Sequence, residues 1–536
     1  MKGFRAVIVT GLCLLLVFAA GCSMSDKASG KNTLRLALIS DPHTADVQLT
    51  TEDYGIPLNI FDRLVEAKTT LPGKSELVPG LAEKWDVSAD GRVYTFHLRQ
   101  GVKFHNGEEL TADDVLFTFD RMLNPKTKAL NSDFLDMIAG AKERLDGKAE
   151  TVKGLKAIDK YTIEITLAEP FGPFLANLAT PAGSIYNRKA TEAAGDQFGL
   201  DPKKTIGTGP FQIKEWQVND HVTLEAFDQY WQGKAALERI VLKVVPDPDT
   251  QKMQFETGEL DVFDCDNART QIPYFEQNEK WKNQIVKGPR VGVYYYCINE
   301  SIKPFDDVRV RKAFQMAVNR QVLLDKLYYG KGQLISTIMP PGLAGYNPDA
   351  PKIAYDLEKA KELLKEAGYA DGFDMVITQV TDNPSSLRVN EAVQAMLKEV
   401  GIRAEIKQMD RATWFATRKQ GQLPMYLSDW SADYNDPDNF IYTFFAPKNS
   451  VVRSFNYQNA AVAAKLEQAR TMTDQNARYK LYQELEEQIV IRDAAWVPLF
   501  TLEHLFVVQP RVKNFTVSWN GWSNMPYYGI SIEEAK

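Results

Sequence analysis

Residues 80–119 read GLAEKWDVSADGRVYTFHLRQGVKFHNGEELTADDVLFTF, and they combine a hairpin with a capped helix. The Asp90-Gly91 pair is typical of a tight turn, and apolar residues alternate after it from Tyr94 to Leu98. Thr111 is a favourable helix N-cap, and the acidic residues that follow it suit the positive end of the helix dipole. The stretch therefore predicts two paired strands followed by a helix.

Similar patterns continue on both sides of this stretch. The pattern of predicted secondary structure changes near Pro181 and again near Tyr294. After Tyr294, helix and strand patterns alternate as in an α/β domain. Alternation predicts strands that start near Leu34, Ile163, Ile240, Ile402 and Trp496, the last ending at Leu502. Amphipathic spacing predicts helices at 307–318, 356–367, 389–400, 460–471 and 475–490. The chain shows no internal repeat.

The chain start has the features of a secretory signal. An apolar run at 6–20 follows two basic residues and is too short to span a bilayer comfortably. It ends in Ala19-Ala20-Gly21-Cys22, which resembles the lipobox of bacterial lipoproteins, where cleavage precedes a cysteine that carries lipid. We expect a signal peptide at 1–21, lipidation of Cys22 and a polar, flexible tether at 22–32. The alternative is an ordinary secretory signal that happens to contain a cysteine.

Composition limits the classes of partner. A mature chain from Cys22 to Lys536 is long enough for about three domains or two large lobes. The net charge of -7 argues against nucleic acid as a partner. Once the signal is removed and Cys22 is lipidated, Cys265 and Cys297 remain. They could form a disulfide in an oxidising compartment or remain two buried thiols.

A second stretch, residues 429–440, combines acidic and aromatic side chains. It reads DWSADYNDPDNF, with four carboxylates, three aromatic rings and no Lys or Arg. Pro437 and the Asn and Asp residues around it indicate a loop. A carboxylate beside an aromatic face suits a cationic group that must leave water. The alternatives are a solvated acidic turn and a calcium loop, although the Asp and Gly order of an EF-hand loop is missing.

Motifs of common enzymes are missing from the sequence. It contains no Gly-x-Ser-x-Gly elbow, no phosphate-binding loop of the Gly-x-x-x-x-Gly-Lys type, no His-Glu-x-x-His and no Cys-x-x-Cys. Its five histidines are scattered, so we expect no metal site and no cofactor. A glycosidase cannot be dismissed by counting carboxylates, but no pattern supports one. We therefore predict that the protein is not an enzyme.

Short motifs in a fixed order run along almost the whole mature chain. They are Gly80–Trp85, Ser88–Gly91, Gly101–Phe104, Thr111–Val115, Gly207–Phe211, Tyr230-Trp231, Gly258–Asp261, Pro304–Arg311 and Ala360–Tyr369. Together they resemble bacterial solute-binding protein family 5, whose members serve the peptide, oligopeptide and nickel ABC importers. The segment from Trp430 to Pro437 makes the chain most similar to the oligopeptide-binding members.

The resemblance implies an α/β, two-lobed periplasmic-binding-protein-like fold of type II, with three domains of which one is an extra small domain. Domain I would be discontinuous, domain II would be the extra small domain and domain III would form the second lobe. The expected ranges are 33–61, 181–293 and 501–536 for domain I, 62–180 for domain II and 294–500 for domain III. Such folds close by a hinge over a ligand held between the lobes.

The same resemblance implies ligand-binding roles in the acidic loop. By its position, Asp433 would bind the α-ammonium group of a peptide, and Trp430 would line a side-chain pocket. The backbone from Asp429 to Ser431 would pair with the peptide as an added strand.

Other residues match the family less closely. Arg418 corresponds to an arginine that reaches the peptide C-terminus, but Leu427 stands about where some members carry a further arginine. Thr50 and Thr51 correspond loosely to an edge segment of the opposite lobe. These matches leave the preferred peptide length open.

The function implied is that of a lipid-anchored, extracytoplasmic binding protein on the outer face of the cell membrane. It would capture peptides and deliver them to permease subunits that work with cytoplasmic ATPases, and it would be a monomer. The alternative is the same fold with a non-peptide cargo, such as a nickel complex or haem; the scarcity of histidine argues mildly against direct metal ligation.

Overall fold

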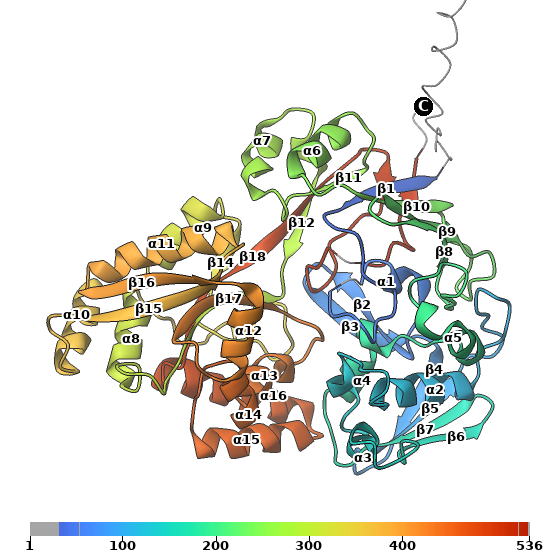
Figure 1. Cartoon of the computed structure of the whole chain (residues 1–536), viewed down its shortest axis with the longest axis horizontal. Helices are drawn as coiled ribbons and strands as arrows, with labels where there is room; N and C mark the ends of the chain where they lie inside the picture. The colour runs from blue at the N-terminus through green and yellow to red at the C-terminus, as the bar shows by residue number, and fades with distance from the viewer. Residues whose placement is uncertain (1–31, 53, 524, 534–536) are drawn as a thin grey trace, which may run out of the picture.

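The computed structural model describes residues 32–52, 54–523 and 525–533, which form two lobes (Figure 1). The predicted signal peptide, Cys22 and the tether as far as residue 31 lie outside the described residues. Within the described ranges, no helix is long and apolar enough to cross a membrane.

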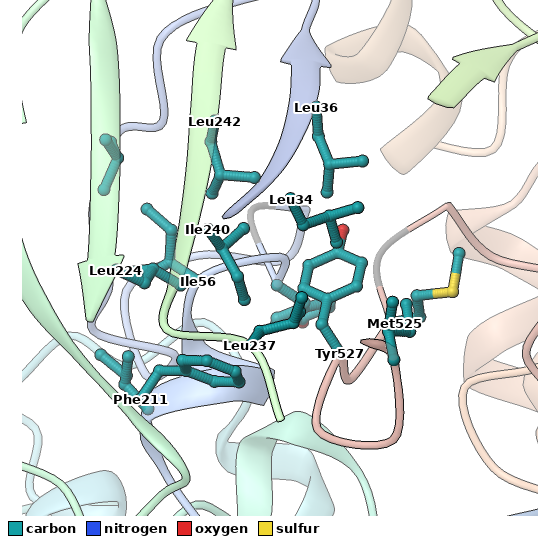
Figure 2. Packing of buried hydrophobic residues seen from close by; sticks show 14 of the residues in the cluster. Leu34, Leu36, Ile56, Phe211, Leu224, Leu237, Ile240, Leu242, Met525 and Tyr527 are labelled. Atoms are coloured by element: carbon teal, nitrogen blue, oxygen red, sulfur yellow. The ribbon is translucent and has the colours of Figure 1, made fainter. Parts of the chain in front are cut away.

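The first lobe contains a sheet in the order β1-β10-β9-β8, formed by Thr33–Leu38, Arg239–Val244, His221–Ala226 and Phe211–Gln217. Leu34 lies opposite Ile240 and Leu36 lies opposite Leu242 in the parallel β1–β10 pair. These residues are buried, and Met525 from near the chain end packs on the same core (Figure 2). The two ends of the chain therefore stabilise one hydrophobic core.

Short helices surround this sheet and the strands beside it. They are α1 (Pro57–Ile60), η2 (Pro181–Gly183), α5 (Arg188–Ala194), η3 (Gly195–Gln197), α6 (Pro248–Glu256), η4 (Arg269–Gln271), α7 (Ile272–Gln277) and η5 (Lys282–Gln284). A small pair, β19 (Val512–Lys513) with β20 (Ser531–Ile532), lies near the C-terminus.

A separate hydrophobic core in the same lobe contains the quoted stretch 80–119. Strands β4 (Ala82–Val87) and β5 (Val93–Leu98) pair as predicted, and Gly91 turns with a φ of +70°. Helix α2 (Ala112–Leu123) begins after Thr111, whose N–H donates to the Asp114 carboxylate at 2.9 Å. The predicted hairpin and capped helix are both confirmed.

The remaining elements of this region complete its core, whose buried apolar residues run from Leu64 to Ile185. The sheet has the order β4-β5-β7-β6, and a hairpin, β2–β3, leads into it. The further elements are β2 (Val65–Leu71), β3 (Lys74–Pro79), η1 (Ser132–Phe134), α3 (Ala141–Leu145), β6 (Leu155–Asp159), β7 (Thr162–Thr166) and α4 (Phe174–Leu178).

The second lobe is built around strands β13 (Gly292–Ile298) and β17 (Met425–Ser431) and the parallel pair β15 (Phe373–Val380) and β16 (Ile402–Met409). Its helices are α8 (Val308–Ala317), α9 (Arg320–Leu327), α10 (Leu357–Glu366), α11 (Pro384–Lys398), α12 (Arg411–Lys419), η6 (Pro437–Asn439), α13 (Ile441–Phe445), α14 (Pro447–Val452), α15 (Ala460–Thr471), α16 (Gln475–Glu487) and η7 (Gln488–Arg492). The helices predicted from amphipathic spacing are all present in this region, with ends shifted by a few residues.

One long strand, β18 (Trp496–Val508), belongs to both lobes (Figure 1). As far as Leu502 it pairs with β13 and β14 (Gly332–Leu334), and from Glu503 onward it pairs with β12 (Ile285–Pro289) and β11 (Val262–Asp264). The sequence predicts this strand only as far as Leu502, because the charged Glu503 and His504 interrupt its apolar run. The strand continues because both lobes supply it with hydrogen-bonding partners.

The two cysteines of the described chain do not pair. Cys265 and Cys297 are both buried and free, and they belong to different hydrophobic cores. Burial raises the pKa of both thiols above the ordinary range, so they remain protonated and unreactive. The open choice between a disulfide and two buried thiols is thus resolved in favour of thiols.

Candidate functional site

A cavity of about 950 Å³ lies between the lobes. From the first lobe its wall includes the β2–β3 hairpin with Lys68 and the aromatic pair Trp519 and Trp522. From the second lobe it includes the segment Asp433–Asp436 and Tyr479. We call this cavity the cleft. Its volume lies in the range of small-ligand sites.

The lobes touch each other around the cleft. The Phe134 ring meets the Tyr434 ring edge-on with centroids 6.1 Å apart, and the Asn435 amide donates to Ser75 Oγ at 3.1 Å. The Gly172 N–H donates to the backbone oxygen of Arg470 at 3.0 Å. Each contact joins one lobe to the other, so the two lobes meet around the cleft.

The acidic loop follows the last strand of a sheet. In the described chain β17 ends the strand order β11-β18-β13-β17, and Trp430 lies opposite Val293 on β13. Near its start the free side of β17 is partly covered, because Thr378 Oγ1 of β15 donates to the Met425 carbonyl at 2.9 Å. The portion from Asp429 to Ser431, predicted to pair with a peptide, lies at the opposite end of this strand.

Asp433 lies on the cleft wall and is half-buried. Its Oδ2 accepts from the Asn439 amide at 3.0 Å, and its N–H donates to Asn439 Oδ1 at 2.9 Å, so Asn439 fixes the carboxylate in place. Burial raises the pKa of Asp433 to about 6, against the lowering effect of the Asn439 hydrogen bond. The Asp133 carboxylate adds to this increase and the Arg453 guanidinium opposes it. Among the ion pairs of the described residues, none involves Asp433, so Arg453 acts on its charge without forming an ion pair with it.

The next two acidic residues of the loop are bound within the second lobe. Asp436 forms a bidentate pair with the fully buried Arg478, with both N–O distances 2.7 Å. Asp438 accepts from the Tyr482 hydroxyl at 3.0 Å and lies 3.2 Å from Arg470 Nε. These carboxylates anchor the loop to α15 and α16.

Trp430 is held by the loop and by an arginine. Its indole N–H donates to the Asn439 carbonyl at 3.0 Å, and its ring meets Phe444 edge-on at 5.5 Å. The guanidinium of Arg453 lies 4.7 Å from the Trp430 ring centre. Trp430 is half-buried but is not among the residues that line the cleft.

Arg418 and Arg453 of the second lobe form no ion pair with a carboxylate among the described residues. The Arg418 guanidinium lies over Phe415 at 4.8 Å, and its Nε is buried without a hydrogen-bond partner. Arg453 is half-buried, and its pKa is lowered by burial and by the neighbouring positive charge of Arg418. Neither arginine lines the cleft itself; Arg453 was not identified from the sequence, where an isolated arginine in Val-Val-Arg-Ser gives no signal.

The other sequence-predicted residues lie at different places. Thr50 is buried with its carbonyl accepting from the Asn131 amide at 2.8 Å, and Thr51 is exposed; neither lines the cleft. The side chain of Asp429 is exposed, and Ser431 is half-buried beside Gly292. Asp433 therefore lines the cleft, whereas Thr50, Thr51, Asp429 and Ser431 do not.

Aromatic residues of the C-terminal segment were missed from the sequence. Trp519 and Trp522 line the cleft, and Trp522 stacks on Tyr54 with a centroid distance of 5.8 Å and an interplanar angle of 7°. The sequence feature that could have identified them is SWNGWSNMPYYG at 518–529, which is rich in aromatic residues and contains no charged residue. Their position becomes clear only once the chain end is folded back on the first lobe.

Two α/β lobes that share a long strand and close over a cavity define a binding protein with the two-lobed, three-domain periplasmic-binding-protein-like fold. The family model described as bacterial extracellular solute-binding proteins, family 5 Middle, matches residues 76–451. The chain therefore belongs to family 5 of the bacterial extracellular solute-binding proteins, as the sequence motifs predict.

Known members show the range of this family. The chain is 33% identical to the dipeptide-binding protein of Escherichia coli, covering 95% of this chain and 100% of that protein. It is 32% identical to heme-binding protein A of Haemophilus influenzae, covering 88% and 87%. The structure of DppA from Helicobacter pylori in complex with the peptide STSA matches with a TM-score of 0.76 and 30% identity, covering 94% of this chain and 98% of that one.

Proposed function

We propose that this protein captures short peptides in the cleft and delivers them to the permease of an ABC importer. The observation that supports this proposal most strongly is the Asp433 carboxylate, which lines the cleft and takes part in no ion pair among the described residues. An uncompensated charge in such a position is unfavourable, as the raised pKa of Asp433 reflects. A ligand ammonium group would remove the penalty.

A peptide N-terminus fits this requirement. Its ammonium has a pKa of roughly 8 and is mostly charged at neutral pH. Closing the lobes over it removes its water, and the opposing carboxylate of Asp433 would compensate for that loss. Asn439 holds the carboxylate in one orientation before the ligand arrives, which reduces the entropy lost on binding.

The other end of a short peptide carries a carboxylate, and Arg453 is its proposed partner. Its guanidinium lacks an acidic partner among the described residues and lies close enough to Asp433 to affect its pKa. The sequence predicts Arg418 for this role. Its positive charge lies close enough to lower the pKa of Arg453, and it would add to the attraction for the ligand carboxylate. Lys68 lines the cleft but is exposed, so its ammonium already has water as a partner.

The backbone of the peptide would pair with the end of β17. This strand ends its sheet in the described chain, and an added strand would obtain hydrogen bonds that do not depend on side-chain identity. Asp429 and Ser431 would contribute backbone groups, with Trp430 forming part of a neighbouring side-chain pocket. Thr50 and Thr51 are proposed to act from the first lobe at the edge of the site.

A nickel complex or haem is the alternative cargo. One relative is named for haem binding, but the described residues that line the cleft include neither histidine nor cysteine. Those are the side chains most often used to ligate iron or nickel. The lining instead combines aromatic, aliphatic, uncharged polar and charged residues of both signs, which suits the mixed polarity of a peptide.

The proposal includes location and domain organisation. The protein would be a lipid-anchored, extracytoplasmic monomer outside the cell membrane, held through Cys22 and its tether. Its three domains would have the ranges stated above, with closure about the segments that join the lobes. A Cys22→Ser variant should leave the membrane fraction without unfolding; continued dependence on detergent would contradict the anchor.

Native mass spectrometry of the gently purified protein tests the cargo. The expected result is a set of co-purified masses that match short peptides and disappear after partial unfolding and refolding. A single porphyrin or metal-complex mass would overturn the peptide proposal in favour of the alternative. Substrate turnover by the same sample would contradict the absence of enzymatic activity.

A further inference from the structure

The buried histidine of the shared strand has two hydrogen-bond acceptors. His504 lies on β18 just beyond the point where the strand passes from one lobe to the other, and it is 2% exposed. Its Nε2 lies 2.9 Å from Asp264 Oδ1, and its Nδ1 lies 2.6 Å from the backbone oxygen of Gly521. A carbonyl and a carboxylate only accept, so each ring nitrogen must carry a proton. The geometry therefore requires an imidazolium.

A protonated Asp264 would be the other way to satisfy Nε2, and its surroundings oppose this. Although burial favours the neutral acid, the positive charge of His504 and a hydrogen bond from the Asp266 N–H at 2.8 Å hold the pKa of Asp264 below its ordinary range. Arg290 adds further positive charge nearby. Asp264 is therefore ionised, and the proton belongs to His504.

The same side chains could suggest a metal site, because ligand atoms of Asp264, Asp266 and His504 lie within 4.8 Å of one another. The arginines around them argue otherwise. Arg269 pairs with Asp266, and Arg290 lies 3.5 Å from Asp266 Oδ2. These cations already balance the carboxylates, so the site is organised around a proton rather than a metal ion.

A second histidine shows the opposite arrangement. His105 Nε2 donates to the Gly209 carbonyl at 3.1 Å, whereas its Nδ1 accepts from the Gly207 N–H at 3.2 Å. One donor and one acceptor require a neutral ring. Burial lowers the pKa of His105 to about 4, while the carboxylates around His504 raise the pKa of His504 despite its burial.

The imidazolium is connected to the cleft through the adjoining C-terminal loop. Gly521, whose carbonyl accepts from His504, is followed by Trp522 and preceded by Asn520, and both of these neighbours line the cleft. The Asn520 amide donates to the Ala432 carbonyl at 3.3 Å, next to Asp433. The carbonyl of Asn520 accepts from the Val291 N–H at 3.1 Å where the chain crosses between lobes.

The loop backbone at this point tolerates little change. Gly521 has a φ of +73°, and a Cβ there would lie 2.7 Å from both Arg290 Cα and the Pro289 carbonyl oxygen. Glycine is therefore required for the loop to approach the crossing segment. The His504 hydrogen bond holds this close approach in place.

We infer that His504 is a positioning residue, a buried imidazolium that holds residues 518–522 against the cleft and makes ligand affinity depend on its protonation. The part that concerns ligand affinity rests on the proposed function; the charge state of His504 does not. The charged groups that face the imidazolium are Asp264 and Asp266, whose Oδ2 lies 3.2 Å from His504 Nδ1. Around these carboxylates lie further charged and titratable groups: Cys265, Arg269, Arg290 and Tyr527.

The sign of the pH effect follows from the raised pKa of His504. The stabilisation is complete below the unfolded pKa of roughly 6.5, and it is lost as the pH rises through the folded pKa. Deprotonation removes one N–H and leaves either Gly521 or Asp264 without its donor. Conversely, ligand binding to the ordered loop should raise the pKa of His504 further, because coupling is reciprocal.

Histidine NMR of the full-length protein tests the charge state without any ligand. Spectra of ring ¹⁵N-labelled protein at pH 6.5, the ordinary histidine pKa, assigned by single His→Gln variants, should show His504 mainly doubly protonated and His105 neutral. Because all other histidines can be assigned in the same way, a failure of His504→Gln to fold does not prevent assignment. A His504 ring that is mainly neutral at pH 6.5 would overturn the inference.

Loop position is read in the same protein with 5-fluorotryptophan. The ¹⁹F signals of Trp519 and Trp522 should shift as the pH rises through the His504 titration and should be displaced at all pH values in His504→Gln. The control His97→Gln removes an exposed histidine that pairs with Asp86 at 3.0 Å, and it should leave these signals unchanged. If these signals change neither with pH nor in the His504→Gln variant, the positioning role is contradicted.

The effect on binding is measured with trialanine as the probe. At pH values below the His504 pKa, wild type should bind trialanine roughly 10-fold more tightly than His504→Gln. At pH values above that pKa, the two proteins should bind it equally. Using the ratio of the two affinities cancels the titration of the peptide ammonium, which both proteins experience equally. A constant ratio across pH would overturn the coupling, whereas failure of trialanine to bind would question the proposed cargo and leave the NMR results to decide the His504 role.

Discussion

The acidic loop at 429–440 has two aspartates in each half, and the aspartates of the two halves have different surroundings. In the second half, Asp436 and Asp438 are buried and compensated by Arg478 and Arg470. In the first half, Asp433 lines the cleft, and among the described residues its carboxylate accepts a hydrogen bond from the Asn439 amide. Carboxylates five residues or fewer apart thus stabilise the fold in one case and, in our proposal, bind a ligand in the other.

The difference shows which property marks the ligand-binding residue. Burial alone does not, because Asp436 is more buried than Asp433. What distinguishes Asp433 is that it lines the cleft and takes part in no ion pair among the described residues, while burial raises its pKa to about 6. Each prediction below tests one side of this comparison.

The largest effect on stability is expected from Asp436→Ala. It leaves the Arg478 guanidinium buried without its carboxylate, which typically costs about 3–5 kcal/mol. Urea denaturation should show this loss, while peptide affinity measured on the remaining folded protein should change little. The double variant Asp436→Leu/Arg478→Met should recover most of the stability, and a single variant as stable as wild type would contradict a structural role for the pair.

A smaller effect is expected from Arg453→Met. If Arg453 binds the carboxylate end of the ligand, its loss should weaken peptide binding by about 1–3 kcal/mol and make C-terminally amidated peptide bind as well as the free acid. Lys68→Met serves as the matched control, because it removes an exposed cation of the cleft wall. Loss of acid-over-amide preference in Lys68→Met instead would transfer the role to Lys68.

The smallest effect is expected from Asp433→Asn on the free protein. Because the folded pKa of Asp433 is raised, ionisation at neutral pH opposes folding, so the neutral variant should be more stable than wild type by about 1 kcal/mol at pH 7.5. The difference should diminish as the pH falls through about 6. Unfolding midpoints at pH 7.5, 6 and 5 measure it, and a destabilised variant would mean that Asp433 has an unrecognised structural partner.

Local patterns in the sequence predict much of the fold. Asp356 caps α10 through the Lys359 N–H, and the hairpin around Gly91 forms as its turn residues indicate. The extent of β18 was underestimated, because its outer part depends on partners more than two hundred residues earlier in the chain. Such non-local pairing leaves no periodic signal at Glu503 and His504.

The site was predicted less completely than the fold. Asp433 lies on the cleft wall, where the family resemblance and the acidic, aromatic loop had suggested a ligand contact. Trp519 and Trp522 reach the cleft only because the C-terminal segment folds back on the first lobe. Whether Arg453 can bind a ligand carboxylate depends on which side chains surround it in the folded protein. Sequence shows which residues are present but not which charges remain uncompensated after folding.

The most direct test of the account compares one tight-binding peptide with its N-acetylated form by titration calorimetry. Acetylation removes the ammonium and Asp433→Asn removes its partner, so each change should weaken binding by about 2–5 kcal/mol, or about 30- to 5,000-fold. The two changes made together should weaken binding by much less than their sum, because they remove the same interaction. Equal affinity of wild type for the free and acetylated peptides would contradict the assignment of Asp433 as the ammonium-binding residue.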